Sequence, residues 1–281
     1  MSFKYDLAVA YRVYPGVSKA NSPPVFSGDK YKLSELCLRS FKSSLGSLRV
    51  KVFVLLDNCP IEYQNLFESL FEQEDLELIQ LKGIGNGPTF EMQIKLLLEQ
   101  NHSGVVYLAE DDYFYMPRQF ESMVSFINSS PDVDFISPYD HVDYYTTSLH
   151  DHPNKIRVAY GKHWRTTNST CLTFMARKQS LEEAKSTFMT FLSGSSDASL
   201  WVSLTKFHVF GIKSIIQYRQ SDPWLYDILK KSWIYNWKEI LFGRRFNVWV
   251  PIPSIATHME KNFLAPNVDW ISILNEKIGT N

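Results

Sequence analysis

The 281-residue sequence contains few cysteines, no long apolar run and almost no net charge. Its three cysteines, Cys37, Cys59 and Cys171, are widely spaced and match neither a disulfide framework nor a metal-ligand pattern, so we expect reduced thiols. Twenty-nine basic and thirty acidic residues leave a formal charge of −1, which indicates no bulk attraction to nucleic acid or anionic lipid. No apolar run approaches the ~20 residues that span a bilayer, and the stretch from Met1 to Asp6 lacks the features of a leader. These absences predict a cytoplasmic protein.

The first half of the chain alternates between two kinds of apolar pattern. Short apolar runs from Leu7 to Val13, Val50 to Leu56, Leu76 to Leu81 and Val105 to Leu108 predict strands. Between them, apolar residues recur at three- and four-residue spacing, which is typical of one buried helix face. The resulting β-α-β-α-β-α-β series predicts an α/β fold with a mostly parallel sheet and helices on both faces. No repeat, low-complexity tract or Gly/Ser linker requires a second domain.

The pattern loosens after about residue 130, where polar aromatic segments become frequent. A strand is expected from Val133 to Ile136, and helices from Leu181 to Leu192 and from Ser195 to Leu204. In the second of these helices, Ser196 or Asp197 is expected near the cap.

Three consecutive acids, Glu110, Asp111 and Asp112, follow the fourth predicted strand. Open α/β sheets hold their ligands at the carboxyl ends of their strands, so these acids are expected at a site. Adjacent carboxylates repel one another unless a cation compensates them, and their oxygens suit Mg²⁺ or Mn²⁺ accompanied by a substrate phosphate. The alternative is a solvated turn, which we favour less because three aromatic residues follow directly.

Two loops in this half offer further candidate contacts. The segment Gly83-Ile-Gly-Asn-Gly-Pro88 predicts a helix start with Pro88 at the first helical position and Asn86 or Gly87 at the cap. Such a start presents backbone N–H groups to an anion, although it is not a Walker loop because no Gly-Lys-Ser/Thr follows. Asp57 closes the second strand, where it would accept a hydrogen bond from a base or ribose or, equally, cap a helix.

The order of these features resembles the GT-A glycosyltransferases, particularly the inverting family 2 type. The resemblance spans most of the chain and rests on Tyr11-Arg12-Val13, Asp57, Asn86-Gly87, the acidic triplet, Asp197-Ala-Ser-Leu-Trp201 and His258. It implies that residues 1–130 bind a nucleotide sugar and that residues 131–281 form the acceptor-binding and catalytic half of the same GT-A domain, with a C-terminal helical and loop extension. The donor contacts that it implies are Tyr11, Arg12, Asp57, Asn86, Gly87, Glu110 and Asp111.

The resemblance also assigns the metal and the base. In the family, the last acid of an Asp-x-Asp motif binds a divalent cation, and Asp112 occupies that position of the motif. Because Glu110 occupies the first position, the resemblance leaves open whether Glu110 or Asp111 faces the ribose. His258 corresponds to a C-terminal histidine that completes the metal site. Asp197 corresponds to the aspartate that takes the acceptor proton, although Ser196 replaces the glutamate that usually precedes it.

The implied reaction is a hexosyl transfer from a nucleoside-diphosphate sugar to a hydroxyl of a glycan or lipid-linked acceptor, as in polysaccharide biosynthesis. Mn²⁺ or Mg²⁺ would neutralise charge on the departing diphosphate, and an oxocarbenium-like transition state attacked from the opposite face would invert the anomeric centre. An acceptor or sugar pocket is expected around Asp140, His141, Asp143, Trp164 and Arg165. Ordinary polar loops explain these residues equally well.

Three other functions fit parts of the sequence. A sugar-phosphate nucleotidyltransferase would carry a Gly-rich loop after the first strand, where this chain has Ala10-Tyr-Arg-Val-Tyr-Pro15. A metal-dependent hydrolase would use Asp140, His141, His150 and His152. A non-catalytic carbohydrate-binding relative would keep the aromatic pocket without transferring a sugar.

Residues 224–249 combine apolar positions at helical spacing with several lysines and arginines. This pattern predicts either a helix packed on the protein's own core or an interfacial helix that brings the protein to a membrane surface. We favour internal packing, because most amphipathic helices bury their apolar side in their own domain.

Overall fold

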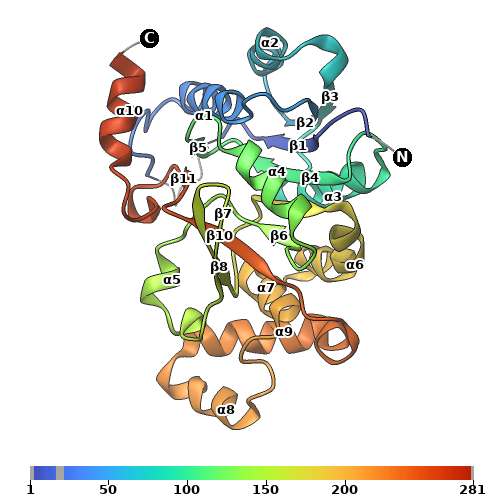
Figure 1. Cartoon of the computed structure of the whole chain (residues 1–281), viewed down its shortest axis with the longest axis vertical. Helices are drawn as coiled ribbons and strands as arrows, with labels where there is room; N and C mark the ends of the chain where they lie inside the picture. The colour runs from blue at the N-terminus through green and yellow to red at the C-terminus, as the bar shows by residue number, and fades with distance from the viewer. Residues whose placement is uncertain (1–2, 17–21, 280–281) are drawn as a thin grey trace.

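A mixed β-sheet with helices on both faces forms the centre of the molecule (Figure 1). The computed structural model describes residues 3–16 and 22–279, so Met1 and Ser2 of the N-terminal stretch lie outside the described residues. Within the described part, nine strands form one sheet in the order β3-β2-β1-β4-β9-β6-β10-β8-β7, and β11 pairs with β5 in a separate ribbon. The strands are β1 (Leu7–Val13), β2 (Val50–Asp57), β3 (Leu76–Leu81), β4 (Val105–Glu110), β5 (Tyr113–Tyr115), β6 (Phe135–Ile136), β7 (Ile156–Ala159), β8 (Lys162–Thr167), β9 (Phe174–Arg177), β10 (Val248–Ile252) and β11 (Ala256–His258).

The helices cover the two faces of the sheet (Figure 1). They are α1 (Lys30–Ser44), α2 (Ile61–Leu70), α3 (Asn86–Glu99), α4 (Phe120–Ser129), α5 (Asp143–Thr146), α6 (Lys178–Met189), α7 (Asp197–Thr205), α8 (Ile212–Ser221), α9 (Pro223–Phe242) and α10 (Trp270–Gly279). The helices α8 and α9 lie together at one end of the molecule (Figure 1). Short 3₁₀ turns lie at Gln73–Asp75, Ser148–His150, Thr190–Ser193 and Lys261–Phe263. In the described residues, no helix is both long and apolar enough to cross a bilayer.

Seven of the nine sheet strands run in the same direction. The neighbours β3, β2, β1 and β4 are parallel, and so are β6 and β10. The strand β9 is antiparallel to both β4 and β6, and β8 is antiparallel to both β10 and β7. The predicted α/β class, with a mostly parallel central sheet flanked by helices, is confirmed.

Burial of β1 on both faces explains why its sequence is apolar from Leu7 to Tyr11. Leu7, Val9 and Val13 pack in the cluster that includes α1, α2 and α4, whereas Ala8 and Ala10 pack in the cluster that includes α3, α6 and α7. A strand that is covered on both faces carries apolar side chains at successive positions. A half-exposed strand instead alternates between apolar and polar side chains. The carboxyl end of β1 is thereby held rigidly beside those of β2 and β4.

The β5–β11 ribbon brings the C-terminal part of the chain to the end of β4. The two strands are antiparallel, with His258 opposite Tyr113. The backbone N–H of Met259 also donates a 2.8 Å hydrogen bond to the carbonyl oxygen of Asp112. Backbone pairing therefore places His258 beside the acidic triplet, although almost 150 residues separate them in sequence.

Candidate active site

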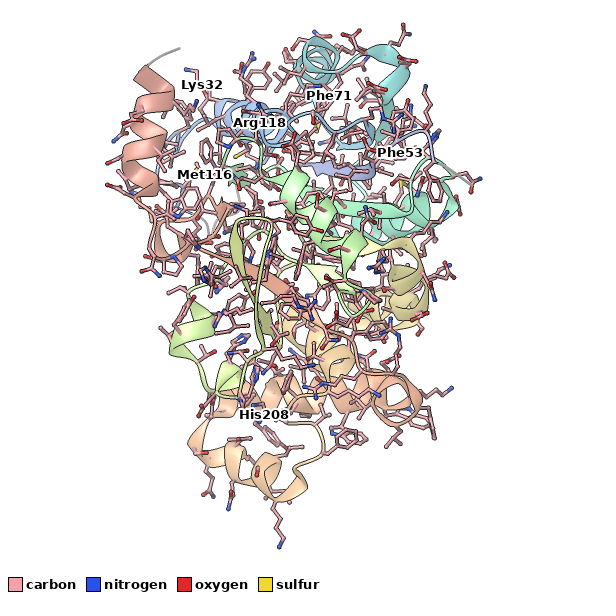
Figure 2. The ribbon with its side chains drawn as sticks, viewed as in Figure 1. Lys32, Phe53, Phe71, Met116, Arg118 and His208 are labelled. Carbon is pink, nitrogen blue, oxygen red and sulfur yellow. The ribbon has the colours of Figure 1, made fainter. Side chains whose placement is uncertain are left out.

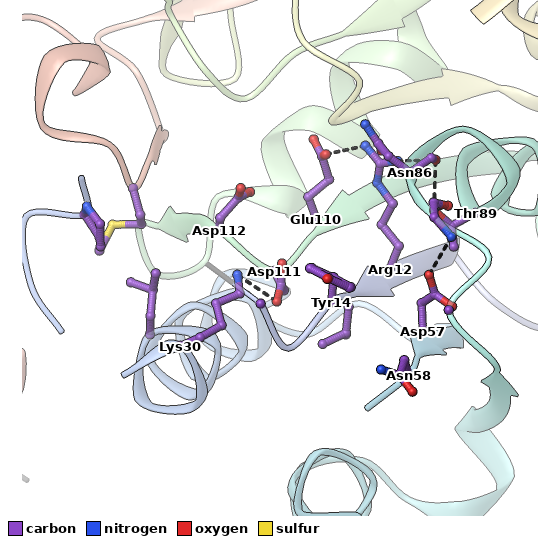
Figure 3. A pocket seen from close by; sticks show the side chains of 17 residues that line it. Arg12, Tyr14, Lys30, Asp57, Asn58, Asn86, Thr89, Glu110, Asp111 and Asp112 are labelled. Carbon is purple, nitrogen blue, oxygen red and sulfur yellow. Dashed lines mark hydrogen bonds and ion pairs between the residues drawn. The ribbon is translucent and has the colours of Figure 1, made fainter. Parts of the chain in front are cut away.

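A cavity of about 470 Å³ lies at the carboxyl ends of β1, β2 and β4 (Figure 3). This is the edge of the sheet at which the sequence predicted a site. Its lining residues are Arg12, Val13, Tyr14, Gly16, Pro23, Lys30, Leu33, Asp57, Asn58, Gly83, Gly85, Asn86, Thr89, Glu110, Asp111, Asp112 and Met259. The five predicted positions Arg12, Asp57, Asn86, Glu110 and Asp111 thus share one cavity with the predicted metal ligand Asp112.

Glu110, the last residue of β4, is bound by an arginine from the neighbouring strand. Arg12 donates from Nη2 to Oε1 of Glu110, and Thr173 donates to Oε2 at 2.7 Å. Arg12 also donates from Nη1 to the side-chain and backbone oxygens of Asn86. One guanidinium therefore joins the ends of β1 and β4 to the start of α3, which uses the planar fork that distinguishes arginine from lysine.

Asp111 forms a buried ion pair with the first residue of α1. Nζ of Lys30 lies 2.9 Å from Oδ2 of Asp111, and the hydroxyl of Ser34 donates to the same oxygen at 2.8 Å. Burial alone would lower the pKa of Lys30, but the charges of Asp111 and Asp112 outweigh it and raise that pKa above its usual range. The ammonium is therefore fully protonated at neutral pH. A positive charge in the first turn of a helix is disfavoured by the helix dipole. The negative charges of Asp111 and Asp112 compensate this unfavourable interaction at Lys30.

Asp112 lies in the turn between β4 and β5 and faces His258. Oδ2 of Asp112 is 3.2 Å from Nε2 of His258, whereas Oδ1 is buried without a hydrogen-bond partner. Burial would raise the pKa of Asp112, but His258 outweighs burial and holds it well below its usual range. Burial would likewise lower the pKa of His258, but Asp112 and the nearby carboxylates of Glu110 and Glu260 raise it. Each partner of the pair thus favours the charged form of the other.

The glycine loop before α3 is held by Asp57. Its two carboxylate oxygens accept hydrogen bonds from the backbone N–H groups of Ile84 and Gly85 at 2.8 and 2.9 Å. Gly85 caps α3 with a φ of +88°, a conformation that favours glycine, and the helix begins at Asn86. The predicted caps, Asn86 and Gly87, and the predicted first position of Pro88 are therefore wrong by one to two residues, because the conformational freedom of Gly85 sets the turn.

Two predicted donor contacts lie outside the cavity. Tyr11 is fully buried in the core, where the rings of Phe41 and Phe67 contact it edge-on at 5.4 and 5.3 Å. Its side chain points to the α1 face of the sheet and not to the strand end. Gly87 packs against Leu192, since a Cβ atom there would lie 3.0 Å from Cδ2 of that residue. Neither residue is among those that line the cavity.

Asp197 is the first residue of α7, and Ser196 caps the helix. The Ser196 hydroxyl accepts from the backbone N–H of Ser199, which leaves the carboxylate of Asp197 free of the capping role. Burial, and secondarily the charge of Glu110, raises the pKa of Asp197 to about 6. Arg12 and Cys171 also lie within its electrostatic reach. Asp197 is therefore a carboxylate within the electrostatic reach of Glu110 whose pKa is raised to about 6, toward the range in which a carboxylate can act as a general base.

Buried apolar residues fix the position of Asp197. Leu200, Trp201 and Leu204 are fully buried on α7, as the sequence predicted. Each contributes about 1.5–3 kcal/mol by its burial, so the helix start cannot move without losing a large part of the domain's stability.

The predicted sugar pocket is mostly core. Trp164 is fully buried, stacks on Phe126 at 4.4 Å and donates from Nε1 to the carbonyl oxygen of Ala159. Its position on β8, beside β10 within the sheet, removes it from any ligand surface. The expectation that Trp164 lines a pocket is therefore corrected.

Asp140 and Arg165 form a buried pair. Arg165 donates from Nη2 to Asp140 at 3.2 Å, the hydroxyl of Tyr145 donates to the second oxygen at 2.6 Å, and Arg165 lies over the rings of Tyr144 and Tyr145. With Asp140 1% and Arg165 8% exposed, this network is structural, and neither residue offers a surface to a sugar. His141 lies nearer the candidate site, because its ring contacts Tyr139 and its pKa is influenced by His258.

The histidines proposed for a hydrolase are not assembled around a metal position. His150 is buried beside Thr167, and His152 stacks on Phe207 at 4.0 Å. His208, a further histidine whose charge acts on His150 and His152, lies near α8 at the end of the molecule opposite Lys32 on α1 (Figure 2). Among residues 3–16 and 22–279, no group of three or more His, Cys, Asp or Glu side chains is arranged to hold a metal ion.

The sequence interpretation missed three polar residues of the site. Lys30, Ser34 and Thr173 bind the acidic triplet from elements that are distant in the sequence. The signal available for Lys30 was its place after Asp29, whose side chain caps α1. That signal predicts the helix start but not that α1 begins beside β4.

Comparison with known proteins gives structural likenesses alone. No protein-family model matches the chain, and no curated protein matches it in sequence. The fold is similar to S. aureus TarS (residues 1–349) in complex with UDP-GlcNAc, at 12% identity and a TM-score of 0.45, over 70% of this chain and 52% of that one. A protein from Desulfovibrio desulfuricans G20 with a provisional assignment as a nucleotide-diphospho-sugar transferase matches at 13% identity and a TM-score of 0.44, over 85% of this chain and 98% of that one.

A cytidylyltransferase from Leptospira borgpetersenii also matches, at 8% identity and a TM-score of 0.36, over 65% of this chain and 64% of that one. Because these TM-scores are below 0.5, we argue function from the geometry of this chain and not from its neighbours. The chain spans about half the length of the TarS chains that it matches.

Proposed function

We propose that the chain is a glycosyltransferase that moves a sugar from a nucleoside-diphosphate donor to a hydroxyl of a glycan or lipid-linked acceptor, with inversion and with the help of a divalent cation. The observation that carries the proposal is the arrangement of Asp112, His258 and Asp197. Asp112 and His258 would offer two ligands to a cation at the acidic triplet, and Asp197, whose pKa is raised to about 6, lies within the electrostatic reach of Glu110. A cation that stabilises a leaving diphosphate and a base that takes a hydroxyl proton would together serve group transfer.

The residues present fit a divalent cation between Asp112 and His258. Two ligands that each lie about 2.1 Å from one octahedral ion are roughly 3 Å apart, and the observed separation of Oδ2 and Nε2 is 3.2 Å. The unpartnered Oδ1 of Asp112 offers a further lone pair. A carboxylate with an imidazole suits Mn²⁺ better than Mg²⁺, which prefers oxygen ligands. The remaining positions would be taken by donor phosphate oxygens and water.

The charge of the cavity supports the need for this cation. Four carboxylates and two basic side chains line it, which leaves an excess of two negative charges. A diphosphate would be repelled by such a wall. When bound, the cation supplies positive charge that stabilises the leaving diphosphate.

The chain's own residues would perform the other tasks. Arg12 and Lys30, both held by carboxylates, keep fixed positive charges at the cavity wall and need no reorganisation when a diphosphate arrives. Asp197 would accept the proton from the acceptor hydroxyl as that oxygen attacks the anomeric carbon. The rigid start of α7 keeps this base in one place.

Replacement of Lys30 by Gln should weaken binding of a nucleoside diphosphate by roughly tenfold. The substitution removes a preorganised positive charge at a partly buried site, and the loss of binding free energy is about 1.4 kcal/mol. Isothermal titration with UDP or GDP, in the presence of Mn²⁺, measures the effect. Lys30→Arg should restore part of the affinity. Lys95→Gln, an exposed lysine on α3, is the matched control. Unchanged affinity in Lys30→Gln would remove this residue from the donor site.

A panel of UDP-, GDP-, dTDP- and CMP-sugars tests the proposal as a whole. Stabilisation against heat by one nucleotide class, with Mn²⁺ and not with EDTA, is the expected result. Transfer to an acceptor, detected by mass spectrometry, separates a transferase from a hydrolase that releases free sugar. Failure of every nucleotide sugar to bind would contradict the proposal and favour a non-catalytic carbohydrate-binding protein.

A further inference from the structure

Exposed apolar side chains extend along the face of α9 that is directed away from the core. The opposite face, with Leu225, Leu229 and Ile240, is buried in the cluster that contains Val202 of α7. Internal packing, the outcome that we favoured for residues 224–249, is thus confirmed for that face. It leaves five apolar side chains of the same helix between 45% and 78% exposed, namely Trp224, Ile234, Trp237, Leu241 and Phe242.

The central members of this set are exposed on both sides of a kink in the helix. Ile234 is 57% exposed before the kink, and Trp237 and Leu241, four residues apart after it, lie above one another on the helix surface. The backbone departs from helical geometry at Asn236, but the alternation continues beyond it, with Ile240 buried and Leu241 exposed. Single exposed apolar residues are ordinary on protein surfaces. Several of them together on one helix are typical of a surface that binds another protein or a membrane.

The same surface carries positive charge that the protein does not neutralise. Lys230 lies four residues before Ile234, and Lys238 four residues after it, and both are exposed. Among the described residues, neither forms an ion pair with an acid, whereas Lys231 is paired with Asp227 at 2.8 Å. We call Lys230, Ile234, Trp237, Lys238 and Leu241 the α9 stripe.

We propose that the α9 stripe binds the surface of an anionic lipid bilayer. The apolar side chains would enter the boundary between headgroups and acyl chains, with tryptophan at its preferred interfacial depth, while the two ammonium groups reach the lipid phosphates. A second copy of this chain is a poorer occupant, because a two-fold interface would bring Lys230 and Lys238 against the same lysines of the other copy. The net charge of −1 did not indicate this binding, because the charge is local to one helix.

The geometry of the molecule is compatible with such a contact. Figure 1 shows α8 and α9 together at one end, opposite the end formed by α2 and β3. No described residue of α8 or α9 lines the donor cavity. A bilayer on the α9 stripe therefore leaves the cavity free. The inference does not depend on the proposed function, since vesicle binding is measured without any sugar donor.

Co-sedimentation of the full chain with phosphatidylcholine vesicles, with and without phosphatidylglycerol, tests the proposal. We expect binding to the anionic vesicles at low salt and its loss at high salt. Lys230→Gln with Lys238→Gln should lower the partition coefficient on the order of 30-fold, since each lysine at an anionic surface contributes about one factor of five. Ile234→Ser, Trp237→Ser and Leu241→Ser together should lower it on the order of 100-fold or more, because their apolar area is lost.

Two matched controls use exposed residues of the same kind elsewhere. Ile156→Ser with Val158→Ser, on the edge strand β7, removes apolar side chains that are 71% and 68% exposed. Lys95→Gln with Lys185→Gln removes two exposed lysines from other helices. Both controls should sediment with the vesicles as the parent does, and all variants should keep the circular dichroism spectrum of the parent.

Three results would overturn the proposal. The first is an absence of vesicle binding by the parent. The second is an equal loss of binding in the controls and in the stripe variants. The third is a dimer in multi-angle light scattering that the apolar stripe variant converts to a monomer, which would assign the stripe to a second copy of the chain.

Discussion

Asp112→Asn should lose nearly all sugar transfer while the protein stays folded. The substitution keeps the size of the side chain but removes the charge that, with His258, would hold the cation. Loss of one preorganised electrostatic partner of a developing charge typically costs on the order of 10²- to 10³-fold in kcat. Initial rates with a saturating donor, measured at several Mn²⁺ concentrations, give this value.

A second measurement separates a lost cation from a damaged fold. Mn²⁺ together with a nucleoside diphosphate should raise the unfolding temperature of the parent but not of Asp112→Asn. His258→Gln should behave in the same direction with a smaller effect, since one ligand of the pair remains. Glu77→Gln, an exposed carboxylate on β3, is the control and should match the parent. Full transfer by the parent in EDTA would remove the cation from the proposal and leave Arg12 and Lys30 as the charges on the diphosphate.

Asp197→Asn should bind donor and cation normally but transfer sugar about 10²- to 10⁴-fold more slowly, which is the range of general-base assistance. The capping residue is Ser196, so the helix start is retained. The parent has a second signature in its pH profile. Because the pKa of Asp197 is raised to about 6, the base is protonated below that pH and ionised above it. The rate of the parent should therefore rise with pH through about 6 and level off near 7.

The variant should lack this limb of the pH profile, because asparagine does not titrate. Single-turnover rates between pH 5 and 8 give both profiles, with titration of UDP as the measure of donor affinity. A variant that loses donor affinity while its turnover is intact would place Asp197 in the donor pocket. The anomeric configuration of the product, read by NMR, tests inversion independently.

The sequence predicted the first half of the fold well because the relevant signals are local. Strands such as Leu7–Val13 and Leu76–Leu81 are short apolar runs, and the helix between the third and fourth strands follows from its own periodicity. The strand-end position of Glu110, Asp111 and Asp112 follows from the same rule. Such patterns depend on neighbouring residues and need no tertiary information.

The ion pairs of the site were not predictable in this way. Lys30 and Asp111 are far apart in sequence, and their contact depends on where α1 packs against β4. The errors at Tyr11 and Trp164 have one common cause. An aromatic side chain with a polar atom suits both a ligand pocket and a core, and only the packed sheet shows which face it occupies. His258 was found by resemblance, because no local pattern connects it to Asp112.

The β5–β11 ribbon has a consequence for biosynthesis of the protein. A ribosome delivers the glycine loop and the acidic triplet early, but β11 leaves the exit tunnel only after residue 258 has been added. Until then, Asp112 lacks both the imidazole beside its carboxylate and the backbone bond from Met259 to its carbonyl oxygen. A nascent chain can therefore build the sheet around β1 and β4 without being able to capture a cation through the complete pair. Under the proposed function, a ribosome-bound chain that ends before β11 would therefore not bind an activated sugar with the help of a cation.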